Sequence, residues 1–168
     1  MKQDLIASGN HIVALFYPVA DAFAGGIDTD VICLRDYEKV TFVIDTGAIE
    51  DAGISNLITV NACTDAAKTG ATAMAFRSRA SLSSTTVDTW TALTDRTSAG
   101  YNFAAAHPAA NVKWLIEVGA DDVSAALANA DFVYLTIAET ANKTITASGN
   151  AILSGARYPK STPETAIA

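Results

Sequence analysis

Short segments of alternating hydrophobic and polar residues recur along the chain and predict β-strands. Val40, Phe42 and Ile44 share one face of such a segment, while Thr41 and Asp45 share the other. Successive side chains of a strand point to opposite faces, so this pattern is typical of strands with one buried face. The same two-residue period is found at Ile58, Val60 and Ala62, at Val112, Trp114, Ile116 and Val118, and at Val133, Leu135 and Ile137.

Weaker patterns predict further strands at residues 11–17, 71–77, 87–93 and 150–156. Residues 31–34 are continuously apolar, which predicts a central strand that is covered on both faces. Helix is scarce. The one good helical start is Asp121 or Asp122, which we expect to cap a turn or two over residues 123–128.

Turn-forming residues separate these segments, among them Gly25-Gly26, Gly47, Gly70 and His107-Pro108. Many short strands with such turns favour an antiparallel sandwich over alternating β and α units. We therefore predict an all-β fold, a single antiparallel β-sandwich that is jelly-roll-like and carries one short helix. The predicted boundaries are an N-terminal arm at 1–10, the sandwich at 11–157 and a C-terminal arm at 158–168.

The last residues of the chain predict an extended arm. Two prolines have no N–H for a central sheet position and cannot continue a helix. We expect this arm to lie on a neighbouring subunit; the alternative is an arm folded back on its own domain. The expected interface residues of both arms are Leu5, Ile6, Arg157, Tyr158, Pro159, Lys160 and Ile167, of which Arg157 and Lys160 would meet a carboxylate of the partner.

Composition favours one globular domain. The chain has 168 residues, of which 50% are hydrophobic and 17% charged. Its net charge of −7 repels phosphate backbones, so we expect no direct binding to nucleic acid. We also expect no membrane span, because no stretch approaches about 18 consecutive apolar residues. An acidic residue, Asp4, argues against a signal peptide, so we expect synthesis in the cytoplasm, with Cys33 and Cys63 as reduced core thiols rather than a disulfide.

Candidate chemistry is sparse, and we expect no catalytic, cofactor-binding or metal-binding residues and no enzymatic activity. The two histidines, His11 and His107, are explained as strand-edge and turn residues, and no nucleophile elbow, phosphate-binding loop or zinc-binding helix motif occurs. Asp28 and Asp30 could share a Ca²⁺ ion, but the rest of a calcium-binding loop is missing. Solvated turn carboxylates are therefore the favoured interpretation.

Three stretches of the chain resemble a group of small structural proteins of tailed bacteriophages that accompany the major capsid protein. The first is Arg157-Tyr158-Pro159 followed by Thr162-Pro163 and Ala166-Ile167. The second comprises residues 11–15, 20–22, 25–26, 30–37 and 40–44, and the third comprises residues 114–118 and 132–137. The resemblance covers both ends and roughly half of the chain. Residues 47–110 lie outside it.

This resemblance implies a virion protein that is assembled in the host cytoplasm. We predict a capsid decoration or cement protein that stabilises the head lattice through contacts with the major capsid protein and with copies of itself. A trimer is the expected oligomer, although composition does not decide this. Alternatives are a neck or tail component of the same virion, a cytosolic enzyme, and a glycan- or receptor-binding sandwich in which Trp90, Tyr101 and Phe103 flank the loop at 94–100.

Overall fold

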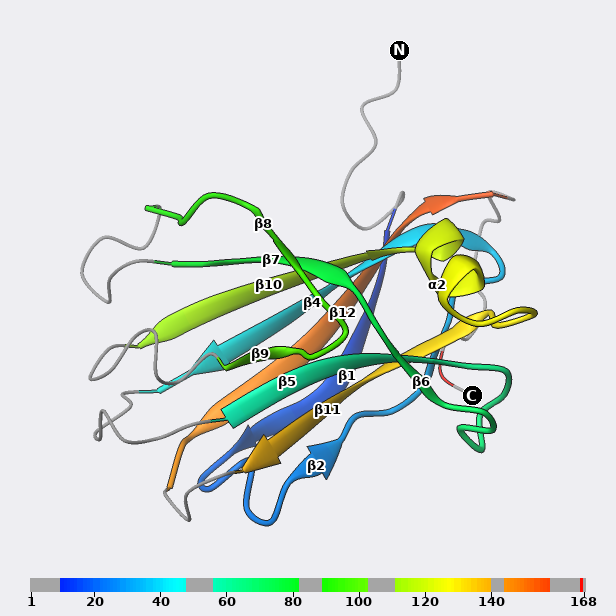
Figure 1. The fold of residues 1–168 in the computed structure, drawn as a ribbon. Coiled ribbons are helices and arrows are strands. Elements are labelled where there is room, and N and C mark those ends of the chain that lie inside the picture. The colour runs from blue at the N-terminus through cyan, green and yellow to red at the C-terminus, as the bar shows by residue number, and fades with distance from the viewer. Residues whose placement is uncertain are drawn as a thin grey trace.

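Two antiparallel β-sheets form the fold (Figure 1). The computed structural model describes residues 10–47, 56–81, 89–102, 111–139, 144–157 and residue 167. Sheet A has the order β1 (Asn10–Val19), β12 (Ala147–Ala156), β4 (Tyr37–Thr46), β10 (Val112–Gly119), β7 (Phe76–Ala80) and β8 (Thr94–Arg96). Sheet B has the order β2 (Ile27–Asp28), β11 (Phe132–Glu139), β5 (Asn56–Cys63) and β6 (Thr72–Met74), with β3 (Ile32–Cys33) also on β11 and β9 (Tyr101–Asn102) also on β5.

The strand order confirms the predicted jelly-roll-like sandwich. The first strand, β1, pairs with the last, β12; β2 and β3 pair with β11, β4 pairs with β10, and β5 pairs with β6. This pairing of early with late strands across two sheets is the double Greek key arrangement of a jelly roll. Strands β7 and β8 extend sheet A beyond this framework.

The hydrophobic core lies between the two sheets and is made by the alternating residues that the sequence identifies. Phe42 and Ile44 on β4 and Leu135 and Ile137 on β11 are each fully buried, and Trp114 on β10 is nearly so. Their neighbours in sequence point to the outer faces of the sheets. The four strongest strand predictions are therefore confirmed, as are the predicted strands at 11–17 and 150–156.

Two weaker strand predictions are wrong in their bounds. Residues 71–77 form parts of two strands, because the chain leaves sheet B after Met74 and enters sheet A at Phe76. Of the predicted strand at 87–93, residues 87 and 88 lie outside the described part. Trp90 makes only an isolated bridge to Ser81, and the next strand begins at Thr94.

The predicted central strand at 31–34 is also wrong in its position. The strand within this segment, β3, pairs with β11 and, through an isolated bridge, with Ile167. Val31 and Ile32 are buried in different clusters, one at the outer face of sheet B and one in the main core. Side chains thus cover both faces of this segment although it lies at the margin of the sheet.

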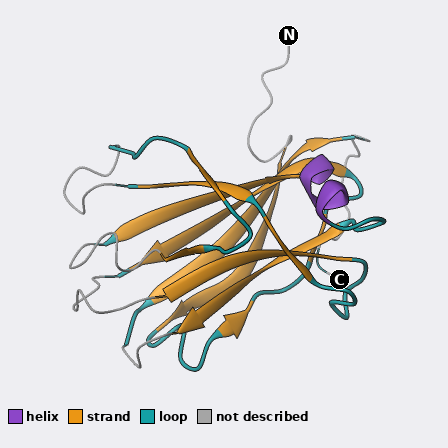
Figure 2. Ribbon diagram, in the orientation of Figure 1, coloured by secondary structure: helices purple, strands orange, loops and turns teal. Residues whose placement is uncertain are grey.

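The single helix of the described residues, α2 (Ala120–Ala126), crosses one end of the sandwich between β10 and β11 (Figure 2). Its cap residue is Gly119 rather than either aspartate, which corrects the prediction. Asp121 and Asp122 lie in the first turn, and the Asp122 carboxylate accepts a hydrogen bond from Gly119 N–H at 3.2 Å. Val123 anchors the helix in the core.

Candidate interaction surface

The margins of the two sheets differ in length and charge. Apart from β1, the strands at the margins have only two or three residues each: β2, β3, β6, β8 and β9. Two of these also carry charge, Asp28 on β2 and Asp95 with Arg96 on β8. Short strands and charged side chains are two of the features by which proteins prevent strands of different molecules from pairing.

Strand β1 has neither form of protection. It has ten residues, contains no Lys, Arg, Asp or Glu, and within the described residues pairs only with β12. Three large hydrophobic side chains of β1 are exposed: Ile12 to 53%, Tyr17 to 79% and Val19 to 50%. Residues 10–19 with these three side chains form the β1 edge.

The hydrogen bonds inside sheet A determine which backbone groups of β1 point away from β12. Gly47 N–H donates to the Thr146 carbonyl at 2.7 Å, next to the paired residues Thr46 and Ala147. A bond in this position means that Thr46 and Ala147 form a non-hydrogen-bonded pair, so the backbone groups of Ala147 point away from β4 and toward β1. The direction then alternates at every residue of β12.

The bond from Ser81 N–H to the Lys113 carbonyl at 2.9 Å sets the same alternation from the other side of the sheet. The alternation continues through the register of β4 with β12 and then through the register of β12 with β1. It places the N–H and C=O of Val13 in bonds to β12. The N–H and C=O groups of Ile12 and Ala14 therefore point off the margin of sheet A.

The regular part of the β1 edge ends near Phe16. Register shifts interrupt the pairing with β12 on both sides of this residue, and Pro18 has no N–H. The Phe16 ring lies over Gly149, where a Cβ atom would collide with the ring, and meets Phe23 edge-on with 6.2 Å between ring centroids. Residues 10–14 are therefore the part of the margin that has a regular strand geometry.

The outer face of sheet A changes from apolar to charged between its two margins. One row of paired residues runs across five strands as Ile12, Ile152, Thr41, Glu117 and Arg77. Its last two members form an ion pair at 3.7 Å. In a further row, Lys113 forms an ion pair with Asp45. The apolar end of this face thus coincides with the unprotected margin.

The predicted interface residues of the arms lie mostly outside the described part of the chain, namely Leu5, Ile6, Tyr158, Pro159 and Lys160. Arg157 is exposed, and its backbone N–H donates to the Asp36 carbonyl at 2.9 Å. Ile167 is 37% exposed and bridges Ile32 of the same chain. At this residue the chain lies against its own domain, which is the alternative stated for the arm.

A polar cluster covers part of the outer face of sheet B. The Asp28 carboxylate accepts hydrogen bonds from Thr136 Oγ1 at 2.6 Å and from Lys68 Nζ at 2.9 Å. Partial burial alone would raise the pKa of Asp28, but the hydrogen bonds from Thr136 and Lys68 and the charge of Lys68 outweigh it and lower the pKa. Asp28 thus lies on a strand and is engaged by protein groups, which corrects the expectation of a solvated turn carboxylate.

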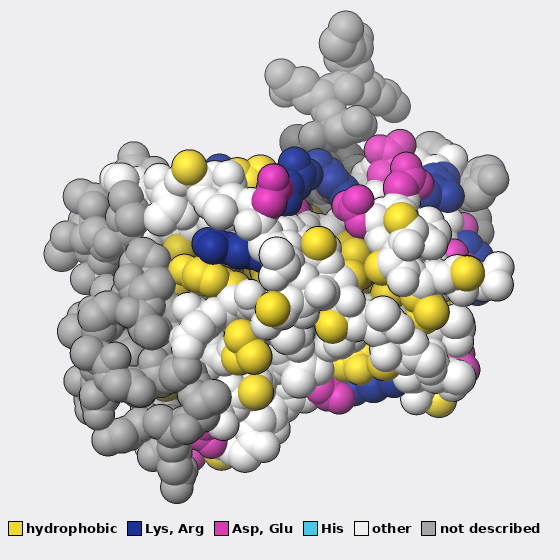
Figure 3. Space-filling model, viewed as in Figure 1, with side chains coloured by type: hydrophobic (Ala, Val, Ile, Leu, Met, Phe, Trp, Pro, Cys, Tyr) yellow, Lys and Arg dark blue, Asp and Glu magenta, His cyan; other side chains and the backbone are white. Residues whose placement is uncertain are grey.

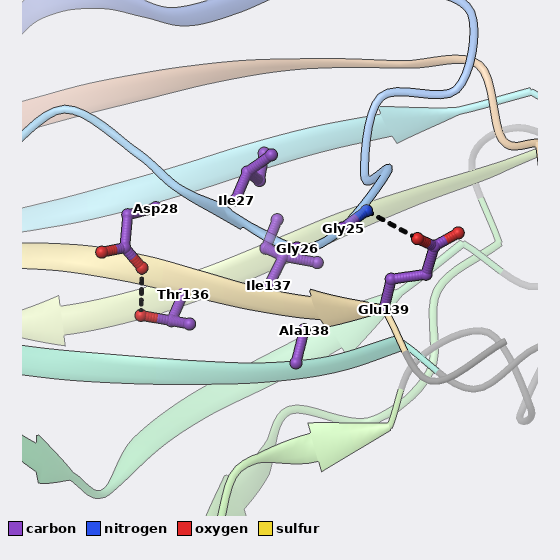
Figure 4. A pocket seen from close by; sticks show the side chains of 8 residues that line it. All are labelled: Gly25, Gly26, Ile27, Asp28, Thr136, Ile137, Ala138 and Glu139. Atoms are coloured by element: carbon purple, nitrogen blue, oxygen red, sulfur yellow. Dashed lines mark hydrogen bonds between the residues drawn. The ribbon is translucent and has the colours of Figure 1, made fainter. Parts of the chain in front are cut away.

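A shallow hollow adjoins this cluster where the Gly25-Gly26 turn meets the end of β11 (Figure 4). The Glu139 carboxylate closes one side by accepting a hydrogen bond from Gly25 N–H at 2.7 Å. Within the described segments, no three His, Cys, Asp or Glu side chains lie close enough together to hold a metal ion. The hollow is accounted for by the turn and its hydrogen bond.

Other candidate residues have structural partners. His11 Nδ1 lies 3.2 Å from the Tyr37 hydroxyl, and His107 is outside the described part. Tyr101 packs against the buried Trp114, with 5.8 Å between ring centroids, and Arg96 lies 3.8 Å from the Tyr101 ring centroid. Tyr101 therefore serves the core rather than an exposed aromatic platform.

The two other aromatic candidates and the two cysteines remain. The Arg79 guanidinium lies over the Trp90 ring, with its Cζ atom 5.1 Å from the ring centroid. Phe103 falls outside the described residues. Both Cys33 and Cys63 are free thiols; Cys63 is buried and Cys33 is partly buried.

The face of the molecule seen in Figure 3 carries its hydrophobic side chains in small separate groups, with acidic and basic side chains close together. No helix in the described ranges is long and apolar enough to cross a membrane.

Comparisons with known proteins give few matches. No protein-family model and no curated protein sequence matches the chain. Among solved structures, the fold is similar to the crystal structure of the SPBc2 prophage-derived protein YomS. That similarity has a TM-score of 0.39 and 10% sequence identity, over 85% of this chain and 92% of the other. At this TM-score the likeness says nothing about the role of the chain.

Proposed function

We propose that this chain is a non-enzymatic structural protein of a tailed-phage virion, and that it decorates or cements the capsid. In this role it binds the major capsid protein and further copies of itself. The proposal is supported by the resemblance of residues 157–167 and of the strand segments to phage structural proteins. The structural observation that carries it is the β1 edge, a ten-residue uncharged sheet margin with three exposed hydrophobic side chains.

The physical logic is that an unprotected sheet margin is suited to a protein that must join other chains. Backbone groups that point off a margin can bind an added strand, and neighbouring side chains then determine which strand fits. Each such contact is small, but contacts repeated across a lattice act together because neighbours are held at high effective concentration. A cement protein stabilises a shell in this way.

The first test is the composition of virions purified from the phage that encodes the chain. We expect the protein in the particle at a copy number that scales with that of the major capsid protein. A copy number matching a single ring would instead indicate a neck or tail component. Absence of the protein from purified particles would overturn the proposal.

A second test addresses the C-terminal arm. Particles that lack the protein are mixed with the purified full chain or with a chain deleted for residues 158–168. We expect the deleted chain to remain folded, as measured by circular dichroism, and to lose binding to particles. Unchanged binding would count against the arm while leaving the β1 edge as the remaining contact.

A further inference from the structure

We propose that two copies of this chain join through their β1 edges, which pair antiparallel about a twofold axis at Ile12. The two A sheets then form one continuous sheet. This inference rests on the proposed assembly role, because it names the surface and the partner through which the chain associates. The partner is a second copy of the same chain.

The backbone of residues 10–14 is suited to this pairing. Ile12 and Ala14 point their N–H and C=O groups off the margin, and the same alternation gives Asn10 that direction. The interruption near Phe16 limits regular pairing to this segment, and its middle residue is Ile12. With Ile12 opposite Ile12 of the second copy, Asn10 lies opposite Ala14 twice, and the three pairs exchange about six hydrogen bonds.

The side chains of the outer face fit the same register. Ile12 is paired with Ile152 inside each copy. In the dimer, Ile12 of one copy would lie beside Ile12 of the other, so that four isoleucines would form one row across the joined sheet: Ile152 and Ile12 of the first copy, then Ile12 and Ile152 of the second. Such directly opposed apolar pairs contribute favourably to strand association. The pairing would cover the Ile12 side chain, of which 53% is exposed in the single chain.

Charge permits a second copy at this margin and at few other places on the surface of the described residues. The chain carries a net charge of −7, so two copies repel each other over most approaches. The β1 edge has no Lys, Arg, Asp or Glu, and the described ion pairs of sheet A lie on β4, β10 and β7. Two copies can therefore meet at this margin without placing like charges opposite one another.

This geometry predicts a dimer in place of the trimer expected from the sequence, because antiparallel pairing of identical strands requires a twofold axis. Pairing over residues 10–14 is short compared with standard protein interfaces. The dimer should therefore form reversibly and strengthen with concentration. On a particle, where neighbours are held close together, the same contact would be more fully occupied.

The main experiment is sedimentation of the purified full chain up to about 1 mM, where even weak complexes are populated. We expect a concentration-dependent dimer that Ile12→Lys abolishes. The matched control is Thr41→Lys, which places the same charge in the same row of the outer face but on β4. In the proposed dimer the two Thr41 residues lie about 24 Å apart, five strand spacings, so this variant should dimerise like the wild type.

Cross-linking tests the register. Ile12→Cys should form a disulfide-linked dimer under mild oxidation, since hydrogen-bonded partners have Cα atoms about 5.5 Å apart, within disulfide range. Thr41→Cys should not. A monomer at all concentrations, a trimer, or equal effects of substitutions at positions 12 and 41 would overturn the inference.

The outcomes separate this inference from the proposed function. A chain that stays monomeric when pure but is found in virions refutes the β1 pairing and leaves the virion role in place. A chain that dimerises through Ile12 but is absent from virions does the reverse.

Discussion

The two margins of sheet A show how one sheet can be closed on one side and open on the other. At one margin, β8 is three residues long and carries Asp95 and Arg96. At the other, β1 is ten residues long and uncharged. Among the described residues, both strands leave backbone groups without a strand partner, so the difference lies in length and side-chain chemistry. This comparison indicates that β1 is the margin suited to joining another chain.

The outer face of sheet A follows the same division. Near β7 the side chains of Arg77 and Glu117 satisfy each other within the chain. Near β1, Ile12 and Tyr17 have large exposed apolar surfaces. Covering exposed apolar side chains with another surface lowers the free energy of the system, whereas covering an exposed ion pair contributes little.

Proline substitutions within β1 should give the largest difference in stability, because they compare an N–H that bonds to β12 with an N–H that points off the margin. Val13→Pro removes an N–H that bonds to β12 and leaves a buried carbonyl without its partner, and we expect it to lower the free energy of unfolding by about 3 kcal/mol. Ile12→Pro removes an N–H that points off the margin and should cost well under half as much. Chemical denaturation of both variants measures the difference. Equal losses would show that the alternation along β1 is wrongly assigned.

A second contrast concerns the anchor of β1. Gly149→Val places a side chain where the Phe16 ring lies, so Phe16 must move away from Phe23. We expect a loss of about 1–3 kcal/mol in thermal or denaturant unfolding. The neighbouring substitution Ser148→Ala serves as the control and should change stability by less than about 0.5 kcal/mol. A neutral Gly149→Val would mean that Phe16 does not hold the end of β1.

The smallest expected effect concerns the charged margin of sheet B. Because the pKa of Asp28 is lowered in the folded chain, its stabilisation is present above the unfolded pKa of about 4 and is lost as pH falls through the folded pKa. Asp28→Asn should therefore lower stability at pH 7 by at most about 1 kcal/mol, given the exposure of the pair with Lys68.

Unfolding curves from pH 7 down to pH 2 check this prediction. The difference between the wild type and Asp28→Asn should shrink as the pH falls. A difference that is constant over this range would contradict the assigned charge interaction.

The sequence predicts the strands of the core but not their order. Val40, Phe42 and Ile44 alternate with polar residues, and this local pattern suffices to identify β4 and its buried face. The change of sheet at Ala75 has no such signal, since no glycine or proline marks it. That break depends on which distant strands accept residues 72–74 and 76–80.

The candidate surface could be predicted only in part. The lack of Lys, Arg, Asp and Glu between residues 10 and 19 can be read directly from the sequence. That these residues form a margin depends on β1 pairing with β12, whose residues lie 128 to 144 positions later in the chain. The cluster of Asp28, Lys68 and Thr136 is likewise assembled from distant segments.

Amide hydrogen exchange at Ile12 and Ala14 shows directly whether a second copy pairs with β1, because these two amides point off the margin of sheet A. We expect fast exchange of these two amides in dilute solution and slowed exchange as concentration rises, while the amide of Val13 stays protected throughout. Fast exchange of Ile12 and Ala14 at every concentration would contradict this pairing.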